Sequence, residues 1–389
     1  MAEYSFMRRR DFLKTSIAGS ALCSLGQTSL SWLFSGNTPH ILADGLAFAE
    51  EPHNLIEARY YKKLEHQEVV CELCPRECKV GDKERGYCGV RENRQGTYYT
   101  LVYNQLCAEH VDPIEKKPFY HFHPGSLAYS IATAGCNMNC KYCQNWDISQ
   151  VRPEQVRSVY RTPGECARNA KEAGSLSISY TYTEPTIFYE YMYDTCEKAR
   201  ALGVKNVMVS AGYIHQRPLT DLCRVMDAIK IDFKAFTDSF YKEICGGRRQ
   251  PVLDAMVTIH KLGVWLEIVY LVVPTLNDTA GEIRDLSKWI HKELGPDIPI
   301  HLSRFHPTYL LTNLPPTPVD TLETLQKVAV AEGIHYAYVG NVPGHPLEST
   351  YCPKCRTRVV QRSGYNVNIE NLEKGSCKNC GTKIPGVWA

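Results

Sequence analysis

The sequence has almost no excess of charge of either sign, and it has no long hydrophobic run. Its 44 lysines and arginines stand against 42 aspartates and glutamates, which leaves a net charge of +2. Nothing in this balance indicates a nucleic-acid surface, because such surfaces need a clear excess of positive charge. The weakly polar stretch 15–34 is broken by Gly, Ser and Gln, so we expect no permanent membrane span there.

Cysteine, in contrast, is abundant. The chain has 17 cysteines in 389 residues, and most of them fall in three groups, each with a C-x2-C pair. Such pairs argue for metal binding rather than a disulfide framework. The other six stand alone and are expected to be packing residues: Cys23, Cys107, Cys166, Cys196, Cys223 and Cys245. The length and the hydrophobic share of 44% are ordinary for one large globular domain with small additions.

The middle group is Cys136, Cys140 and Cys143, and no fourth cysteine stands close by. Thiolates are the usual ligands of iron–sulfur clusters, and a cube of four irons normally takes four of them. Three ligands leave one iron open, and an open metal position is where substrate binds. The group therefore predicts a catalytic cluster, with a zinc knuckle or a buried thiol cluster as the alternative.

The first residues look like an export signal. The run from Arg8 to Lys14, RRRDFLK, is followed by the weakly polar stretch and by a small-x-small site at 47–49, which is typical of a twin-arginine signal over residues 1–49. Export to the periplasm or cell envelope is expected if the signal is used, and a cytoplasmic location if it is not. The alternative is a basic amphipathic start without a targeting role. Leu22 before Cys23 is too large for lipoprotein cleavage.

Residues 55–125 are expected to form a Cys-rich and hairpin region. Four cysteines within eighteen residues can close a tetrahedral thiolate site, although disulfides compete if the protein matures outside the cytosol. These cysteines are Cys71, Cys74, Cys78 and Cys88. A hairpin is expected over 97–125, with a strand at 98–102 and a turn at 112–118. His121 and His123 are expected to be surface or packing residues.

Residues 126–345 alternate strands and helices, which predicts parallel strands with helical crossovers. Expected strands cover 127–132, 176–182, 206–210, 228–233, 265–273, 298–305 and a short last one at 336–339, with helices at 164–173, 187–202 and 321–332. Six βα repeats indicate a partial barrel, and in such barrels the chemistry lies at the C-terminal strand ends. The cysteine loop and the polar residues selected below fall at such ends.

Residues 347–389 carry two C-x2-C knuckles that read as a zinc ribbon. The four cysteines are Cys352, Cys355, Cys377 and Cys380. Four thiolates fill all positions around one ion, so the expected role is structural. A redox dithiol and a rubredoxin-like iron are the alternatives.

Several motifs carry a resemblance to a known family: DPIEKKP from Asp112, GCNMNCKYCQNW from Gly135, YTEPT from Tyr182 and IPGVW from Ile384. The cysteine loop reads C-x3-C-x-aromatic-C, with Tyr142 as the aromatic residue, and resembles the radical S-adenosylmethionine (SAM) superfamily. From Leu55 to Trp388 the chain resembles its pyruvate formate-lyase activating enzyme branch, and within that branch the radical SAM enzymes of the AmmeMemoRadiSam system. The implied fold class is α/β: a partial (β/α)6 radical SAM barrel with an N-terminal Cys-rich segment and a C-terminal zinc ribbon.

The resemblance also implies residue roles. Cys136, Cys140 and Cys143 would ligate a [4Fe–4S] cluster whose open iron chelates SAM. Candidate SAM-binding residues are Tyr142, Glu184 for the ammonium, Ser210, Asp232, Lys234 for the carboxylate, and His306. Tyr182 and Thr183 depart from the Gly-Gly that the family has before Glu-Pro. The alternatives are a helix-cap role for Glu184, an internal ion pair for Asp232 and Lys234, and packing for Ser210 and His306.

The activity implied is that of a radical SAM oxidoreductase. One electron from the cluster would split SAM to a 5′-deoxyadenosyl radical, which abstracts hydrogen from an unknown substrate, either a protein glycyl site or a small molecule. An electron donor and Memo-like and AMMECR-like proteins are the implied partners. The rival hypothesis is a non-enzymatic metal-cysteine scaffold that recruits a protein. A third is a protein that cleaves SAM unproductively.

Overall fold

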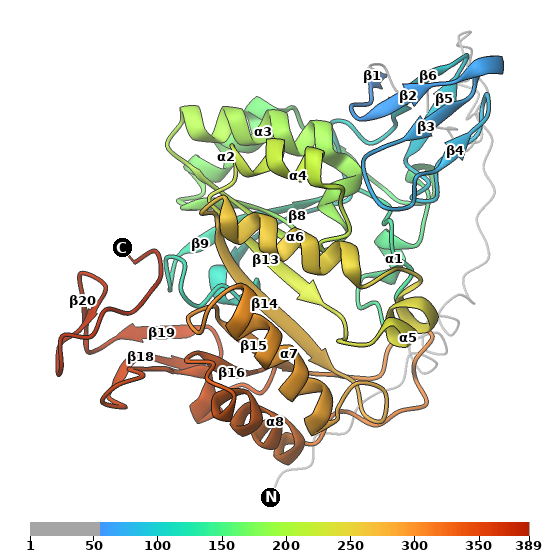
Figure 1. Cartoon of the computed structure of the whole chain (residues 1–389). Coiled ribbons are helices and arrows are strands. Elements are labelled where there is room, and N and C mark those ends of the chain that lie inside the picture. Colours follow the sequence, from blue (N-terminus) through green and yellow to red (C-terminus); the bar gives the residue numbers. More distant parts are fainter. Residues whose placement is uncertain (1–54, 389) are drawn as a thin grey trace, which may run out of the picture. The chain divides into compact units, whose positions relative to one another are not determined.

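The computed structural model describes residues 55–388, and its central element is an eight-stranded sheet (Figure 1). The strands are β8 (Ala108–Pro113), β9 (Leu127–Ala132), β11 (Ser177–Tyr180), β12 (Lys205–Ser210), β13 (Ala228–Phe233), β14 (Trp265–Val272), β15 (Ile300–Arg304) and β16 (Ala337–Gly340). They lie in the order β16-β15-β14-β13-β12-β11-β9-β8. All neighbours pair in parallel except β8, which pairs antiparallel with β9 at the edge.

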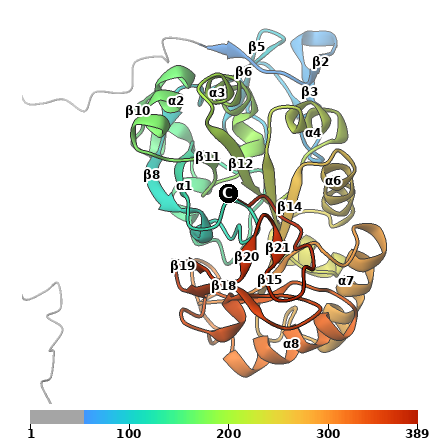
Figure 2. The same ribbon diagram turned by 90° about the vertical axis from the view of Figure 1, so that its left-hand side faces the viewer.

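Helices connect the parallel strands and line the outside of the sheet (Figure 2). They are α2 (Pro163–Glu172), α3 (Tyr189–Ala201), α4 (Gln216–Cys223), α6 (Gln250–Lys261), α7 (Ala280–Glu293) and α8 (Val319–Ala331). Local sequence fixes their starts: Thr162 and Glu165 form a capping box on α2, and Thr279 caps α7. The α/β alternation expected from the sequence is thus confirmed.

Short elements fill the connections. Helix α1 (Trp146–Ser149) follows the cysteine loop, and α5 (Asp238–Phe240) runs into a π-helical turn (Tyr241–Cys245). Strands β7 (Gln105–Leu106) and β10 (Val159–Tyr160) pair with each other. The 3₁₀ turns are Glu65–Gln67, Ile114–Lys116, Pro153–Gln155, Pro185–Phe188 and Pro346–Glu348.

The N-terminal region forms two small antiparallel sheets, β1-β6-β5 and β2-β3-β4. Their strands are β1 (Ile56–Glu57), β2 (Tyr61–Lys63), β3 (Val69–Cys71), β4 (Lys79–Val80), β5 (Arg91–Arg94) and β6 (Thr97–Thr100). The hairpin expected over 97–125 is wrong. Strand β6 pairs backward with β5, and the turn near 114–116 instead joins β8 to β9, because β8 finds its partner in the main sheet.

The C-terminal tail adds a three-stranded sheet, β17 (Thr350–Tyr351), β18 (Arg358–Ser363) and β19 (Asn366–Ile369), and a pair, β20 (Leu372–Glu373) with β21 (Ser376–Cys377). It packs against residues 120–123, which precede β9. Arg362 donates to the carbonyl of Tyr120 at 2.6 Å, and Phe122 bridges to Val387. His121 is fully buried, with one ring nitrogen 2.6 Å from the carbonyl oxygen of Pro385. His121 is thus a packing residue.

Two sequence expectations concern the membrane and export. In the part of the chain that the structure describes, none of the helices combines the length and the apolar character needed to cross a bilayer. The twin-arginine signal expected over residues 1–49 lies outside the described residues.

Candidate functional site

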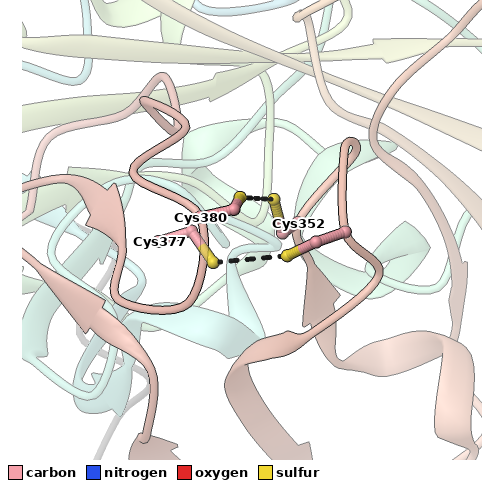
Figure 3. Close-up of side chains that lie close together, drawn as sticks. Cys352, Cys377 and Cys380 are labelled. Atoms are coloured by element: carbon pink, nitrogen blue, oxygen red, sulfur yellow. Dashed lines mark hydrogen bonds between the residues drawn. The ribbon is translucent and has the colours of Figure 1, made fainter.

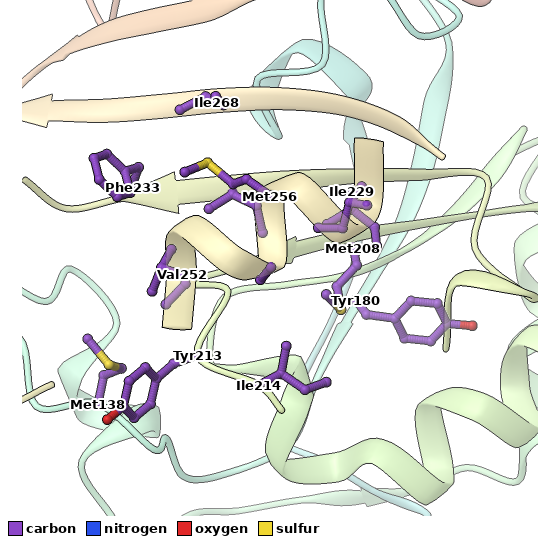
Figure 4. Packing of buried hydrophobic residues seen from close by; sticks show 14 of the residues in the cluster. Met138, Tyr180, Met208, Tyr213, Ile214, Ile229, Phe233, Val252, Met256 and Ile268 are labelled. Carbon is purple, nitrogen blue, oxygen red and sulfur yellow. The ribbon is translucent and has the colours of Figure 1, made fainter. Parts of the chain in front are cut away.

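The middle cysteine loop begins directly after β9, at the C-terminal edge of the sheet. Met138, at the middle of the loop, is buried in the main core next to Tyr213, which anchors the loop between its first two cysteines (Figure 4). The backbone N–H of Met138 also donates to the sulfur of Cys136 at 3.3 Å. The charges of Cys136, Cys140 and Cys143 all interact, so the three thiols converge.

Two of the predicted SAM-binding residues lie beside these thiols. The Glu184 carboxylate lies near Cys136, and the Lys234 ammonium lies near Cys140 and Cys143. Glu184 follows β11 and Lys234 follows β13, so both come from C-terminal strand ends. The structure therefore places an anion and a cation beside one cysteine loop.

Glu184 is held by several donors. Its Oε1 accepts from the hydroxyl of Ser210 at 2.6 Å, and from the backbone N–H and hydroxyl of Thr186 at 3.1 and 2.7 Å. Its Oε2 accepts from the N–H of Ala211 at 2.8 Å. The residue thus has the helix-cap contact considered from sequence, and Ser210 positions it. A carboxylate oxygen has two lone pairs, so Oε2 keeps one acceptor position for a ligand.

Asp232 is bonded mainly to Lys230, two residues earlier on β13, and its other oxygen lies 3.7 Å from the Lys234 ammonium. Burial opposes ionisation of Asp232, but Lys230 and Lys234 outweigh it and hold its pKa below the ordinary value. An ion pair is therefore present, as the alternative reading expected. Asp232 thus lies between two lysines, and Lys234 has both Asp232 and the thiols of the cysteine loop beside it.

The other two candidates differ. The Tyr142 ring is buried beside the cysteine loop, with its hydroxyl 3.4 Å from the sulfur of Cys245. His306 is exposed, and the following segment contacts the loop instead: Leu310 N–H donates to the carbonyl of Lys141 at 2.9 Å, and Tyr309 stacks on Trp146. The role of His306 stays a prediction.

Sequence reasoning missed two residues at this site. Cys245, expected to be a packing residue, lies against the cysteine loop: its carbonyl accepts from the N–H of Asn139 at 3.0 Å, and its thiol hydrogen-bonds with Cys140. Arg76 donates to the carbonyl of Asn137 at 2.9 Å and to that of Gly246, and stacks on Tyr87. The only available signal was weak, namely that Arg76 falls inside the first cysteine group.

The donor set fits an iron–sulfur cluster. Burial raises the pKa of Cys136, and hydrogen bonding with Cys245 together with burial raises that of Cys140. Buried thiolates are unfavourable without a compensating cation, which bound iron and Lys234 would provide. Three thiols converge, and backbone N–H groups of Met138 and Asn145 donate to the sulfurs of Cys136 and Cys143. Such N–H donors are typical of iron–sulfur sites.

The C-terminal cysteines have a different geometry. The sulfurs of Cys352, Cys355, Cys377 and Cys380 all lie within 4.8 Å of one another, with Cys352 3.6 Å from Cys380 and Cys355 3.7 Å from Cys377 (Figure 3). Four thiolates around a tetrahedral zinc lie roughly 3.8 Å apart, given Zn–S bonds of about 2.3 Å. Within residues 55–388, no other group of three or more His, Cys, Asp or Glu side chains has its ligand atoms this close together. The arrangement fits a single metal ion.

The DPIEKKP and YTEPT motifs meet beside the site. The Asp112 carboxylate accepts from Lys116 at 2.7 Å, from Lys117 at 2.6 Å and from the hydroxyl of Tyr182. Burial opposes ionisation of Asp112, but these three donors outweigh it, and its pKa lies well below 3.8. Burial lowers the pKa of Lys117 to about 8. The carbonyl of Tyr182 accepts from Asn145 at 2.8 Å, which ties this cluster to the cysteine loop.

Replacing Asp112 by asparagine should lower the free energy of unfolding by about 3 kcal/mol at neutral pH, because it leaves the buried Lys117 charge without its partner. The folded-state pKa of Asp112 lies below its unfolded value, so its contribution is complete above that value and is lost on acidification. The difference between wild type and variant should therefore begin to shrink below about pH 5 and should continue to shrink down to the folded-state pKa of Asp112. Denaturant titrations at several pH values measure it.

Asp238 provides the matched control, since its side chain is 76% exposed beside Arg249. Asp238→Asn should change the free energy of unfolding by less than about 0.5 kcal/mol. An equal loss of unfolding free energy in the two variants would show that the buried Asp112 ion pair stabilises the fold no more than an exposed one.

Comparison with known proteins agrees with this geometry. The family described as the radical SAM superfamily matches residues 130–290. The uncharacterized protein MJ0808 of Methanocaldococcus jannaschii is 45% identical over 330 residues, which cover 84% of this chain and 98% of that protein. The pyruvate formate-lyase-activating enzyme of Clostridium pasteurianum is 23% identical over 159 residues, 40% of this chain and 66% of that enzyme.

Among solved structures, a radical SAM methyltransferase from Sphaerobacter thermophilus superimposes with a TM-score of 0.45 at 18% identity, over 56% of this chain and 67% of that one. The family match spans β9 to α7, which includes the cysteine loop, Glu184 and Lys234.

Proposed function

The chain belongs to the radical SAM superfamily, and from this premise we propose that it is an enzyme that reductively cleaves SAM at a [4Fe–4S] cluster. The observation that carries the proposal is the convergence of three thiols at a C-terminal strand end, flanked by Glu184 and Lys234. The family implies both cofactors, which when bound supply one-electron cleavage and hydrogen abstraction.

The protein's own residues would bind and orient. Cys136, Cys140 and Cys143 would hold the cluster. The free acceptor position on Glu184 Oε2 suits an ammonium group, and the Lys234 ammonium, 14% exposed, suits a carboxylate. These are the two charged ends of the amino-acid part of SAM. Ser210 and Ala211 would keep the Glu184 carboxylate in place, and Asp232 would do the same for Lys234.

The experiment is anaerobic reconstitution with iron and sulfide, reduction by dithionite, and addition of SAM. Formation of 5′-deoxyadenosine and methionine is expected. The rival scaffold predicts zinc at all three cysteine groups and no SAM binding, so metal analysis of the same sample separates the two. Uncoupled cleavage would leave a third outcome, in which 5′-deoxyadenosine forms but no substrate is consumed.

Replacing Glu184 by glutamine should weaken SAM binding about ten- to a hundredfold, the loss of one charge-assisted hydrogen bond of roughly 1.5–3 kcal/mol. Isothermal titration of the reconstituted protein with SAM measures the dissociation constant. Glu165→Gln is the control, because Glu165 also accepts at a helix start, from Thr162 at 2.7 Å, but in α2. An unchanged SAM affinity in the Glu184 variant would show that Glu184 acts only as a helix cap.

Substrate and partners follow by analogy. One relative carries the name of a pyruvate formate-lyase-activating enzyme, which supports a protein glycyl site as one substrate class; a small molecule is the other. We further propose an electron donor and association with Memo-like and AMMECR-like proteins, from the AmmeMemoRadiSam resemblance. The RRRDFLK run supports export, and a fractionation experiment with the full chain tests it.

The C-terminal cysteines support a separate proposal, that of a structural zinc site. Hydrogen bonding with Thr357 lowers the pKa of Cys355 to about 5, which favours the thiolate that a metal needs. The sulfur spacing suits one ion, and all positions around it would be filled, so no substrate would reach it.

A further inference from the structure

The four cysteines of the N-terminal region converge at one place. Cys71 ends β3, Cys74 and Cys78 lie between β3 and β4, and Cys88 lies before β5. The backbone N–H of Cys71 donates to the carbonyl of Cys78 at 2.9 Å, and a Cβ on Gly86, two residues before Cys88, would lie 3.7 Å from the sulfur of Cys78. All four are free thiols. Four thiols gathered from one strand end and the two loops beside it call for a ligand.

The backbone N–H of Tyr87 donates to the sulfur of Cys78 at 3.3 Å, as that of Met138 donates to the sulfur of Cys136 in the cysteine loop. Such a donor stabilises negative charge on sulfur, which is what a metal-bound thiolate carries.

The spacing separates two kinds of metal site. The four C-terminal sulfurs all lie within 4.8 Å of one another, as the ligands of a single ion do. In the described part of the chain, neither the four N-terminal sulfurs nor the three of the cysteine loop are this close together. In an iron–sulfur cube each thiolate binds a different iron, so its ligands lie farther apart than those of one ion. The N-terminal group therefore lacks the close spacing of the tail's single-ion site, which leaves room for a cube rather than one ion.

The two groups are neighbours in space. A Cβ on Gly135, which precedes Cys136 and has φ +97°, would lie only 2.8 Å from the carbonyl oxygen of Cys88. Arg76, which lies between Cys74 and Cys78, donates to the carbonyl of Asn137 in the cysteine loop at 2.9 Å. Cys88 and Cys136 also line one cavity of about 880 Å³, Cys88 from the N-terminal region and Cys136 from the barrel loop. A group bound at either set would lie directly beside the other.

We propose that Cys71, Cys74, Cys78 and Cys88 hold a second, fully ligated [4Fe–4S] cluster that passes electrons to the one in the barrel. With four thiolates it has no open iron, so it carries no substrate. It takes one electron from an external low-potential one-electron donor, such as a reduced flavodoxin-type protein, and is reoxidised when that electron moves to the barrel cluster. The electron-relay role depends on the proposed function, but the presence of the second cluster does not.

The test is the iron content of full-length protein reconstituted with iron and sulfide. Two cubes of four irons predict about eight irons per chain in the wild type. The triple variant Cys136→Ala/Cys140→Ala/Cys143→Ala should keep about half, with a cluster absorption band. The variant Cys71→Ala/Cys74→Ala/Cys88→Ala should also keep about half. Cys166→Ala/Cys196→Ala/Cys223→Ala, a control that removes three isolated buried cysteines, should keep all of it.

Loss of all iron from the barrel triple variant, or zinc in place of iron at the N-terminal group, overturns the proposal. If that variant does not fold, electron paramagnetic resonance of the reduced wild type decides. SAM should change the signal of about half of the spins, since it binds only a cluster with an open iron. A single signal that changes completely with SAM also overturns the proposal. Absence of SAM cleavage with eight irons present would contradict only the proposed function.

Discussion

Replacing Cys140 by alanine is expected to reduce 5′-deoxyadenosine formation at least about a thousandfold, a loss of more than ~4 kcal/mol of transition-state stabilisation. Cys140 is one of three thiols for one cluster, and the neighbouring groups offer no equivalent ligand in its place except Cys245, which hydrogen-bonds with it. A loop with two ligands should not retain a cube through turnover. The assay is chromatographic detection of 5′-deoxyadenosine from the reduced, reconstituted variant after addition of SAM.

Cys223→Ala is the matched control, because Cys223 is buried at the end of α4 and burial alone raises the pKa of its thiol. It should retain wild-type iron and activity. A double variant Cys140→Ala/Cys245→Ala tests rescue by the adjacent thiol. Wild-type activity in both the single and the double variant would defeat the proposed function, whereas activity lost only in the double variant would show that either thiol can serve as the ligand.

The second large effect concerns the tail. Replacing Cys377 by serine, or removing the metal with a chelator, should unfold residues 347–388, because apparent binding free energies of structural zinc amount to roughly 10 kcal/mol or more. The expected observation is rapid hydrogen exchange in strands β18 to β21 with slow exchange kept in β11 to β14. The barrel's iron content should stay unchanged.

The loss should also reach the base of the barrel. The Glu267 carboxylate accepts from His301 at 2.7 Å and from the N–H groups of Tyr120 and His121, and the tail covers this network through Arg362 and Trp388. Exchange of the Tyr120 and His121 amides should therefore accelerate as well. Cys107→Ser, at an isolated cysteine, is the control. Slow exchange in a metal-free tail would show that packing alone holds it.

The features that could be predicted from the sequence are those defined by short spacings along the chain. The C-x3-C-x2-C loop, the two C-terminal knuckles and the strand-then-polar pattern that placed Glu184 and Lys234 all lie within a few residues of one another or follow one strand. The strand and helix alternation was readable for the same reason, since periodic burial is a local property.

What could not be predicted depends on contacts across the chain. Cys245 lies beside Cys140 because a π-helical turn after β13 folds back onto the cysteine loop. No local sequence pattern predicts this contact. The partner of Asp232 is Lys230, although the sequence offers Lys234 equally well at the same spacing. The wrong hairpin at 97–125 has another cause: β6 pairs with β5 before it and β8 pairs with β9 after it, so the strand and the turn seen in the sequence belong to two different hairpins.

The guanidinium of Arg76 joins segments that are 61 and 170 residues away, at Asn137 and Gly246. Contacts between segments so far apart in sequence slow folding, because loop-closure entropy must be overcome before they form. The same contacts hold the backbone of the cysteine loop to the N-terminal region and to the end of the π-helical turn, so one side chain couples three parts of the chain.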